Sequence, residues 1–416
     1  MPGAAPVRVE WRRTVPDIDD VAPEWRELET VVRARTVFST FDYLATWYRH
    51  YAGADGGQPL IGVARRGTRL VGIAPLVVRP ARLARVPITR INFAVHDAHA
   101  GEFLAQDDDP TIVSAFIDSL VRTVRFDVIC LNGFDPTSDP FRALQQAGCD
   151  HRLAFESAPQ FHALADLRNG YDGYCRAMSR NFRRSVKRQA KRVAAAGHPI
   201  VDGVFLEERL DQYEDAIGRF IAITEASYKL KGQRLAACHR NFLSELVRRF
   251  APRGMVASPI LSIDGCDAAF LVGLVERGCF YDVSLAYADR FANLSPGTHL
   301  MQKALQQLAR AGVHTMMSHG AHEYKRRWST AFVSTVQVLL FARTIRATAS
   351  RFIRSSLGRV VRHLNRPRGD THAGRNHTTS SPCWHPAQRA AHRIGNAGAN
   401  KGNRATHPST AGRTFL

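Results

Sequence analysis

Residues that can carry acid–base and electrostatic catalysis are concentrated between positions 282 and 325 of the sequence. Tyr324 and Lys325 are adjacent, and a lysine ammonium can stabilise negative charge that develops in a transition state. The side chains near them that can act as a general base toward an amine are Asp282, His319, His322 and Glu323. Spacing does not choose among these bases, and Lys325 can also be a surface lysine that packs beside Trp328. The candidate catalytic residues are Lys325, Tyr324, His319 and Asp282.

A second group of residues is suited to holding an anion. In the stretch Leu294–Thr298, Ser295 is a good helix N-cap and Pro296 suits the first helical position. The next backbone N–H groups would then lack intrahelical acceptors at the positive end of the helix dipole. Gly297 lets a ligand approach the backbone closely. The pattern predicts a phosphate or pyrophosphate site, and the alternative is an ordinary capped surface helix.

The elements around this loop favour the phosphate interpretation. An apolar strand is predicted at 280–286, a helix at 298–311 and another strand at 313–317. Phosphate-bearing ligands bind at such strand-to-helix connections in many α/β folds. The sequence has no GxGxxG or GxxxxGK[ST] string, which argues against a dinucleotide or a nucleoside triphosphate.

A strongly basic helix is predicted at 179–193. Three- and four-residue steps place five of its basic residues along one stripe: Arg180, Arg184, Lys187, Arg188 and Lys191. No acidic residue compensates them, so an anionic partner such as an acidic polysaccharide, a lipid-linked phosphate or a tRNA backbone would relieve their repulsion. The alternative is a solvated helix face.

The rest of the chain has the pattern of two similar halves. A helix at 41–48, strands at 60–64 and 69–76, a helix at 111–124 and a strand at 127–131 are predicted in the first half. The second half has a helix at 210–226 and strands at 256–262 and 268–275 before the stretch described above. We therefore expect two α/β domains, at 1–165 and 166–345, followed by a basic, largely disordered tail at 346–416.

Composition limits the classes of protein that fit. The chain has 416 residues and a net charge of +20, of which +13 comes from residues 341–416, so the charge says little about a nucleic-acid partner of the folded part. The seven cysteines form no CxxC pair, and we expect no metal site. We find no signal peptide and no apolar run long enough to span a bilayer, and we expect a cytoplasmic protein.

Three blocks of the second half resemble the CelD/BcsL-type acetyltransferase family, a branch of the GNAT superfamily related to the Fem-type aminoacyl transferases. They are the basic helix that begins at Ser179, the segment Ala226-Ser227-Tyr228-Lys229 with Gly232 after it, and the stretch from Tyr287 through Ser295-Pro296-Gly297 to Tyr324-Lys325. The first half is similar to the first domain of that family at 38–47, 72–76 and 127–129.

The resemblance implies a mixed α/β protein with two tandem GNAT-like domains that uses acetyl-CoA or another acyl-CoA as cosubstrate. The cofactor-binding residues that it implies are Ser295, Pro296, Gly297, Thr298 and Tyr287. The substrate-binding residues that it implies are Lys229, Tyr228, Arg180 and Arg184. Two positions depart from the family: Met316 stands where an Asp is common, and Tyr228 where Trp is usual.

The expected function is transfer of an acyl group from acyl-CoA to an amine or hydroxyl of a small-molecule or sugar acceptor, in cellulose, exopolysaccharide or cell-envelope biosynthesis. One alternative is a Fem-like transferase that uses aminoacyl-tRNA, which the basic helix would accommodate. Another is a nonenzymatic polyanion-binding protein on a GNAT-like scaffold, with Met316 marking lost chemistry.

Overall fold

The computed structural model describes residues 6–364 except 33–35, 54–55, 97–99, 207–210, 228–229, 231–233 and 321. It divides into two compact units. The larger contains residues 1–81 and 89–343, and the smaller contains residues 82–88 and 344–416. Each unit is described below by itself.

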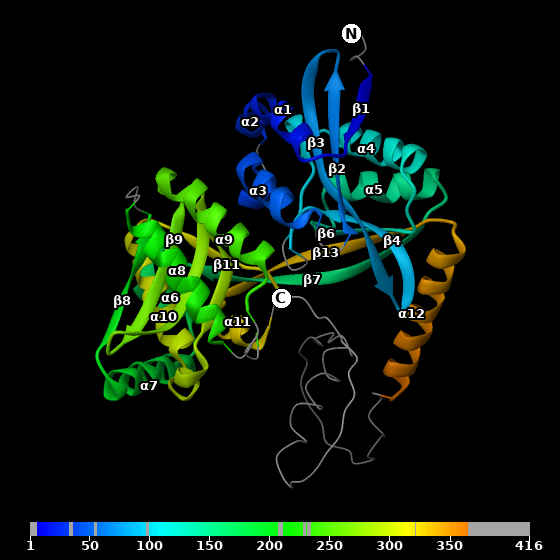
Figure 1. Cartoon of the computed structure of the whole chain (residues 1–416). Helices are drawn as coiled ribbons and strands as arrows, with labels where there is room; N and C mark the ends of the chain where they lie inside the picture. Colours follow the sequence, from blue (N-terminus) through cyan, green and yellow to red (C-terminus); the bar gives the residue numbers. More distant parts are fainter. Residues whose placement is uncertain are drawn as a thin grey trace. The chain divides into compact units, whose positions relative to one another are not determined.

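The helices and strands alternate along the chain (Figure 1). The α-helices are α1 (Pro16–Asp20), α2 (Ala22–Val31), α3 (Phe41–Tyr51), α4 (Pro110–Thr123), α5 (Asp139–Asp150), α6 (Gly170–Ala177), α7 (Arg180–Ala196), α8 (Asp211–Glu225), α9 (Ala237–Phe250), α10 (Pro296–Arg310), α11 (Glu323–Trp328) and α12 (Ile345–Leu364). The 3-10 helices are η1 (Val37–Ser39), η3 (Gln106–Asp108), η4 (Ala251–Arg253) and η5 (Asp289–Leu294).

The strands are β1 (Val7–Arg12), β2 (Gln58–Arg66), β3 (Arg69–Leu83), β4 (Val86–Phe93), β5 (Leu104–Ala105), β6 (Val128–Phe134), β7 (Ala154–Asp166), β8 (Pro199–Phe205), β9 (Val256–Ile263), β10 (Cys266–Glu276), β11 (Cys279–Tyr287), β12 (Thr315–Ser318) and β13 (Ala331–Phe341). Each strand and helix predicted in the sequence is present within a few residues at its ends, except that β3 continues to Leu83, seven residues beyond its predicted end at 76. The predicted tail differs, because its first part is the helix α12, and residues 365–416 lie outside the described part of the chain.

The described strands of both halves join one mixed sheet. Its order is β1-β2-β3-β4-β6-β13-β7-β12-β11-β10-β9-β8, and β5 pairs with β3. The strand β13 comes at the end of the second half in the sequence but lies between β6 and β7 of the first half, antiparallel to both. Its register with β7 runs from Ala331 opposite Leu164 to Phe341 opposite Ala154. The predicted boundary at 165 therefore falls near the end of a strand that connects the halves.

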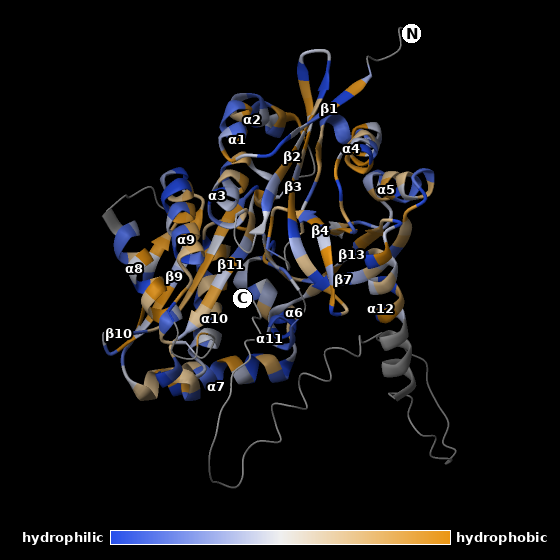
Figure 2. Ribbon diagram, turned by 45° about the vertical axis from the view of Figure 1, so that its right-hand side comes forward, coloured by the Kyte–Doolittle hydropathy of each residue, from blue (hydrophilic) through white to orange (hydrophobic). Residues whose placement is uncertain are grey.

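The core lies between the sheet and the helices that cover it, where Figure 2 shows the apolar residues of the strands concentrated. Aromatic side chains such as Trp25, Trp47 and Phe270 are fully buried there, which is the main source of stability. A charged network joins α3 of the first half to α9 of the second. In this network Asp42 pairs with Arg249 at 3.0 Å, and Glu245 pairs with Arg49 at 2.6 Å.

Candidate active site

The strands β11 and β12 run parallel, and their pairing ends before β11 does. The last paired residues are Tyr281 and Met317, whereas β11 continues to Tyr287 beside β10. A bulge at Val283 shifts the register between β10 and β11, since Ser284 lies opposite Val272 and Asp282 opposite Gly273. A bulge of this kind redirects neighbouring side chains and backbone groups. The bulge on β11 therefore lies shortly after the last residue that pairs with β12.

The helix α10 begins where the sequence predicts it, but its first turn differs from the prediction in two respects. Ser295 occupies the N-cap position in a left-handed conformation (φ 53°), and its hydroxyl makes no capping hydrogen bond. The Thr298 N–H is not free, because it donates to the Ser295 carbonyl at 3.0 Å. Pro296 is buried and has no N–H to satisfy. The left-handed turn, and not a side-chain cap, starts this helix.

Gly297 faces open space in this turn. A Cβ built on it would meet no other atom within 4 Å. A ligand can therefore approach the Gly297 backbone at the N-terminus of a long helix, where the dipole favours an anion. Tyr287, at the end of β11 on the way to this turn, is half-buried and packs against the core beneath α10.

Lys325 is held in place by two contacts. Its Nζ lies 3.0 Å from Oδ2 of Asp282 and donates to the His319 carbonyl at 2.7 Å. The side chains of Lys325 and Asp282 are 14% and 8% exposed, so solvent screens the pair little. The other carboxylate oxygen of Asp282, Oδ1, is buried without a hydrogen-bond partner among the described residues. A buried oxygen of this kind is a ready acceptor for an N–H or O–H of a ligand.

The family resemblance places an Asp at the position of Met316, on β12, whereas the carboxylate next to Lys325 comes from β11. Met316 occupies the position where an Asp is common, and it lies opposite Phe280 in the β11–β12 pair. Asp282, two residues further along β11, supplies the acidic group next to Lys325. The substitution at Met316 does not leave the lysine without a carboxylate.

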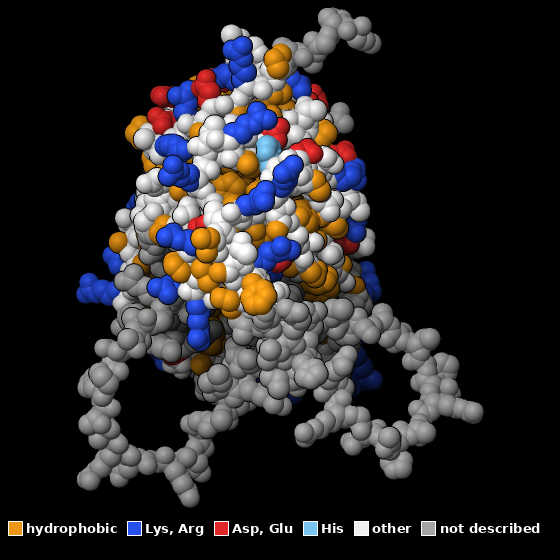
Figure 3. Space-filling view, turned by 90° about the vertical axis from the view of Figure 1, so that its right-hand side faces the viewer, with side chains coloured by type: hydrophobic (Ala, Val, Ile, Leu, Met, Phe, Trp, Pro, Cys, Tyr) orange, Lys and Arg blue, Asp and Glu red, His pale blue; other side chains and the backbone are white. Residues whose placement is uncertain are grey.

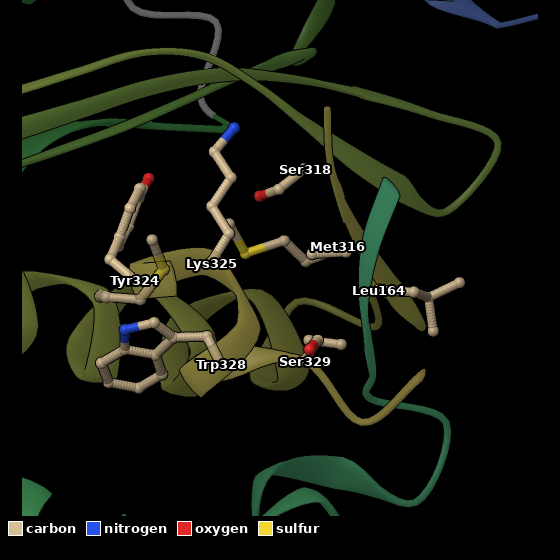
Figure 4. Close-up of a pocket in the computed structure, with 10 residues that line it drawn as sticks. Leu164, Met316, Ser318, Tyr324, Lys325, Trp328 and Ser329 are labelled. Atoms are coloured by element: carbon tan, nitrogen blue, oxygen red, sulfur yellow. The ribbon is translucent and has the colours of Figure 1, made fainter. Parts of the chain in front are cut away.

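Lys325 also lines a small pocket that is open to solvent. In Figure 4 the stem of Lys325 rises between Tyr324 and Met316, and the Ser318 hydroxyl points toward it. Tyr324 is 38% exposed, so its phenol is accessible from outside. The residues that line the pocket come from β7, β12, α10 and α11 and include Ala163, Leu164, Ala165, Met301, Trp328 and Ser329.

Two buried histidines, His319 and His162, lie near Lys325. The rings of His319 and His162 are 5.1 Å apart. Burial, with smaller effects from His162 and Lys325, holds the pKa of His319 well below its usual value. Burial and then Lys325 also lower the pKa of His162. Both imidazoles are therefore neutral near pH 7, and the contact of His319 with Lys325 is made by its backbone carbonyl. Burial and Lys325 lower the pKa of the more exposed His322 as well.

The first half contributes residues that the sequence analysis did not include in the site. The ring of Phe38, in η1, packs edge-on against His319 at 4.8 Å and against Tyr281 at 5.5 Å. The Ala100 N–H donates to Nδ1 of His319 at 3.4 Å. Phe38 opens the 38–47 segment that resembles the first domain of the family, and this was the only signal for it in the sequence. Nothing in the sequence pointed to Ala100.

The basic helix α7 packs against α10 and η5. Arg192 donates to the Asn293 carbonyl at 2.6 Å, just before the start of α10. Arg180 and Arg184, together with Lys187, Arg188 and Lys191, are exposed, as the predicted stripe requires. Tyr228 and Lys229 lie outside the described residues. Within the described part of the chain, no group of three or more His, Cys, Asp and Glu is arranged to hold a metal ion, and none of its helices is long and apolar enough to cross a membrane.

Comparison with known proteins places this site within a described domain. Residues 180–326 match the family described as "Acetyltransferase (GNAT) domain". The match begins at α7 and ends one residue after Lys325, and it includes β11, α10 and β12. The second half of the chain therefore carries a GNAT acetyltransferase domain. No curated protein sequence matches the chain.

Solved structures are similar over most of the chain at low sequence identity. FemX has a TM-score of 0.52 and 9% identity, with 83% of this chain and 99% of FemX covered. The C-terminal domain (DUF2156) of an Agrobacterium fabrum protein described as a lysylphosphatidylglycerol synthetase has a TM-score of 0.50 and 12% identity, with 82% and 96% covered. A tandem GNAT protein from the clavulanic acid biosynthesis pathway has a TM-score of 0.47 and 12% identity, with 81% and 100% covered.

At these identities the likeness concerns the fold. The chain has a mixed α/β fold with a large mixed sheet and GNAT topology, and the predicted fold class is confirmed.

Proposed function

We propose that this protein transfers an acyl group from acyl-CoA to an amine or hydroxyl of an acceptor. The observation that carries the proposal is the buried Lys325–Asp282 pair at the end of the β11–β12 pairing. The unpartnered Asp282 Oδ1 and the open turn at Gly297 lie on the same strand and on the helix that follows it. A GNAT acetyltransferase domain covers all of these residues.

The acyl-CoA would lie along β11 and reach the start of α10. We infer that its pyrophosphate is held by the turn Ser295, Pro296, Gly297 and Thr298. The open space at Gly297 and the positive end of the α10 dipole support this placement. The early end of the β11–β12 pairing supports a pantetheine arm beside the second half of β11, with Tyr287 near its outer part.

Each catalytic candidate would have a distinct part in the reaction. The nitrogen or oxygen of the acceptor attacks the thioester carbonyl and loses its proton to Asp282, whose Oδ1 is the open acceptor. The C–S bond then breaks, the acyl group stays on the acceptor, and the CoA thiolate takes up a proton. Lys325 would stabilise the negative charge of the transition state. The partly exposed side chain of Tyr324 would contact the acceptor, and His319 would position Lys325 through its carbonyl.

The acceptor is proposed to be a small molecule or a sugar in cellulose, exopolysaccharide or cell-envelope biosynthesis. This part rests on the resemblance of the sequence to CelD/BcsL-type acetyltransferases. Tyr228, Lys229, Arg180 and Arg184 are the proposed substrate-binding residues. We further propose a cytoplasmic protein whose domains correspond to residues 1–165 and 166–345.

The second candidate is a Fem-like transferase that uses aminoacyl-tRNA. It is favoured by the exposed basic face of α7, which packs beside the start of α10. The third candidate, a nonenzymatic polyanion-binding protein, is less well supported, because Asp282 provides the carboxylate that Met316 lacks.

Calorimetry and a turnover screen test the proposal. Acetyl-CoA and CoA should bind the full chain, and a screen of amino sugars and amines should release free CoA thiol with at least one acceptor. No binding at millimolar acyl-CoA would refute acyl-CoA dependence. Binding of tRNA that persists after deletion of residues 365–416 and competes with the acyl donor would favour the Fem-like candidate.

A further inference from the structure

The helix α12 exposes large apolar side chains to solvent. Ile345 is 90% exposed, Phe352 is 67% exposed and Ile353 is 37% exposed. At 100° per residue, Ile345, Phe352 and Ile353 lie within about 100° of one another on the helix surface. Exposed apolar side chains gathered on one stripe indicate an interaction surface, whereas single exposed ones are common on any protein.

This stripe is distinct from the face that α12 uses for packing. Ala347 and Ser350 are fully buried. They lie one helical turn apart, since their numbers differ by three, and point away from the side of Ile345 and Phe352. The folding of the protein therefore leaves the apolar stripe without a described cover.

The charge of α12 is entirely positive. Its sequence contains five arginines, at 346, 351, 354, 359 and 362, and no Asp or Glu. The other segment of the same compact unit, residues 82–88, adds the exposed Arg82 and Arg85 and also has no acid. On the face of the molecule that Figure 3 shows, hydrophobic side chains gather among lysines and arginines. An apolar stripe on a helix whose charges are all basic matches an anionic lipid surface.

We propose that α12 docks this protein on the surface of a membrane that contains anionic lipids. The stripe would enter the boundary between headgroups and acyl chains, and the exposed Arg346, which lies beside Ile353 on the helix surface, would contact the lipid phosphates. None of the described helices, α12 included, is long and apolar enough to span a bilayer. A nucleic acid would satisfy the arginines but not Ile345 and Phe352. A second copy of α12 would satisfy the stripe but bring like charges together. The proposal is independent of the acyl-transfer function.

Sedimentation of the full chain with vesicles tests the proposal. Vesicles of phosphatidylcholine with phosphatidylglycerol should bind the protein, and vesicles of phosphatidylcholine alone should bind it weakly. The double variant Ile345→Ser with Phe352→Ser should lower binding by about tenfold or more, because it removes two large apolar side chains from the stripe. Arg346→Gln should lower it by about fivefold. Raising the salt concentration should weaken binding of the unaltered protein.

The matched control is Ile200→Ser, which alters an isoleucine that is 48% exposed on β8. It should bind vesicles like the unaltered protein, and thermal unfolding should show that all variants remain folded. Equal binding of the double variant and the unaltered protein would overturn the proposal. Loss of binding only when residues 365–416 are deleted would also overturn it, since the tail and not α12 would then be the anchor. Binding to RNA without binding to vesicles would assign the surface to nucleic acid instead.

Discussion

The two halves of the molecule contain the same local arrangement of two parallel strands with a helix between them in the sequence, but the helix starts and the strand ends differ. In the first half, β4 and β6 are parallel, and α4 lies between them in the sequence. In the second half, β11 and β12 are parallel, and α10 lies between them. Both helices begin with a proline, Pro110 and Pro296. What differs is the residue before the proline and the side chains at the end of the strand pair.

The helix start in the first half already holds an anion. The Asp109 carboxylate accepts from the Thr111 N–H at 2.8 Å and also pairs with Arg66. Ser295 makes no equivalent bond at the start of α10. An aspartate cap supplies the negative charge that the helix dipole favours, whereas an uncapped turn leaves that role to a ligand.

The strand ends also differ. Phe93, at the end of β4, packs on Phe103 at 5.0 Å and on Phe134 at 6.0 Å. A cluster of aromatic rings therefore fills the end of the β4–β6 pair. At the end of the β11–β12 pair the sheet carries the charged pair of Asp282 and Lys325. The same arrangement of two parallel strands and a helix is therefore filled by core side chains in the first half and carries the candidate site in the second.

The largest effect is expected from Asp282→Asn. The amide keeps the shape of the carboxylate but cannot take a proton from the acceptor, so turnover should fall by about 100-fold or more. Acyl-CoA affinity should change little. The measurement is CoA thiol release with the acceptor found in the screen. Asp267→Asn is the control, because Asp267 also lies in a strand, β10, and pairs with a cation, Arg219 of α8. This variant should keep its activity. Full turnover by Asp282→Asn would show that another residue is the general base, and the difference between the two strand ends would then not explain the activity.

A smaller effect is expected from Gly297→Glu. The side chain would occupy the open space at the start of α10 and repel a pyrophosphate, so acetyl-CoA affinity should fall by about tenfold or more. Calorimetry measures it. Gly218→Glu is a matched control, since Gly218 also lies in a helix and a Cβ there would meet nothing within 4 Å. Unchanged affinity of Gly297→Glu would show that the anion site lies outside this turn.

Asp109→Ala removes the side-chain cap of α4, so that the first-half helix start has no capping side chain, as at Ser295 in the second half. Loss of the cap should lower the free energy of unfolding by about 1 kcal/mol, measured by urea denaturation. Acetyl-CoA binding should be unchanged, because the phenylalanines still fill the strand ends. If this variant bound a second acetyl-CoA per chain, the cap alone would account for the difference in ligand binding between the two halves, and the aromatic side chains at the strand ends would not contribute.

The smallest effect concerns pH. The pKa of His319 is lowered on folding, so the unfolded chain binds a proton near pH 6.5 that the folded chain does not. The stability contribution is present above that pH and is lost as pH falls below it. His319→Asn should make the free energy of unfolding fall less steeply between pH 7 and pH 5, by at most about 1.4 kcal/mol per pH unit. The exposed His198→Asn is the control, and equal slopes for all three proteins would exclude His319 as a source of acid sensitivity.

Local patterns in the sequence determined much of this protein. The alternation and apolar runs of 256–286 predicted β9, β10 and β11, because strand formation there follows from side chains that each strand buries on its own. The Ser-Pro-Gly string located the start of α10, and the density of arginines located an exposed face of α7. The predicted cap failed at Ser295 because the residue takes a left-handed conformation, which no neighbour in the sequence indicates.

Tertiary structure decided which residues meet. Asp282 was one of four candidate bases in the sequence, and only the parallel pairing of β11 with β12 brings it to 3.0 Å from Lys325. Phe38 reaches His319 because the sheet joins the two halves through β13. Spacing along the chain reports helix faces and strand alternation, which are local, whereas contacts between distant strands depend on the order of the whole sheet. The types of side chain were therefore readable from the sequence, and their pairing was set by the fold.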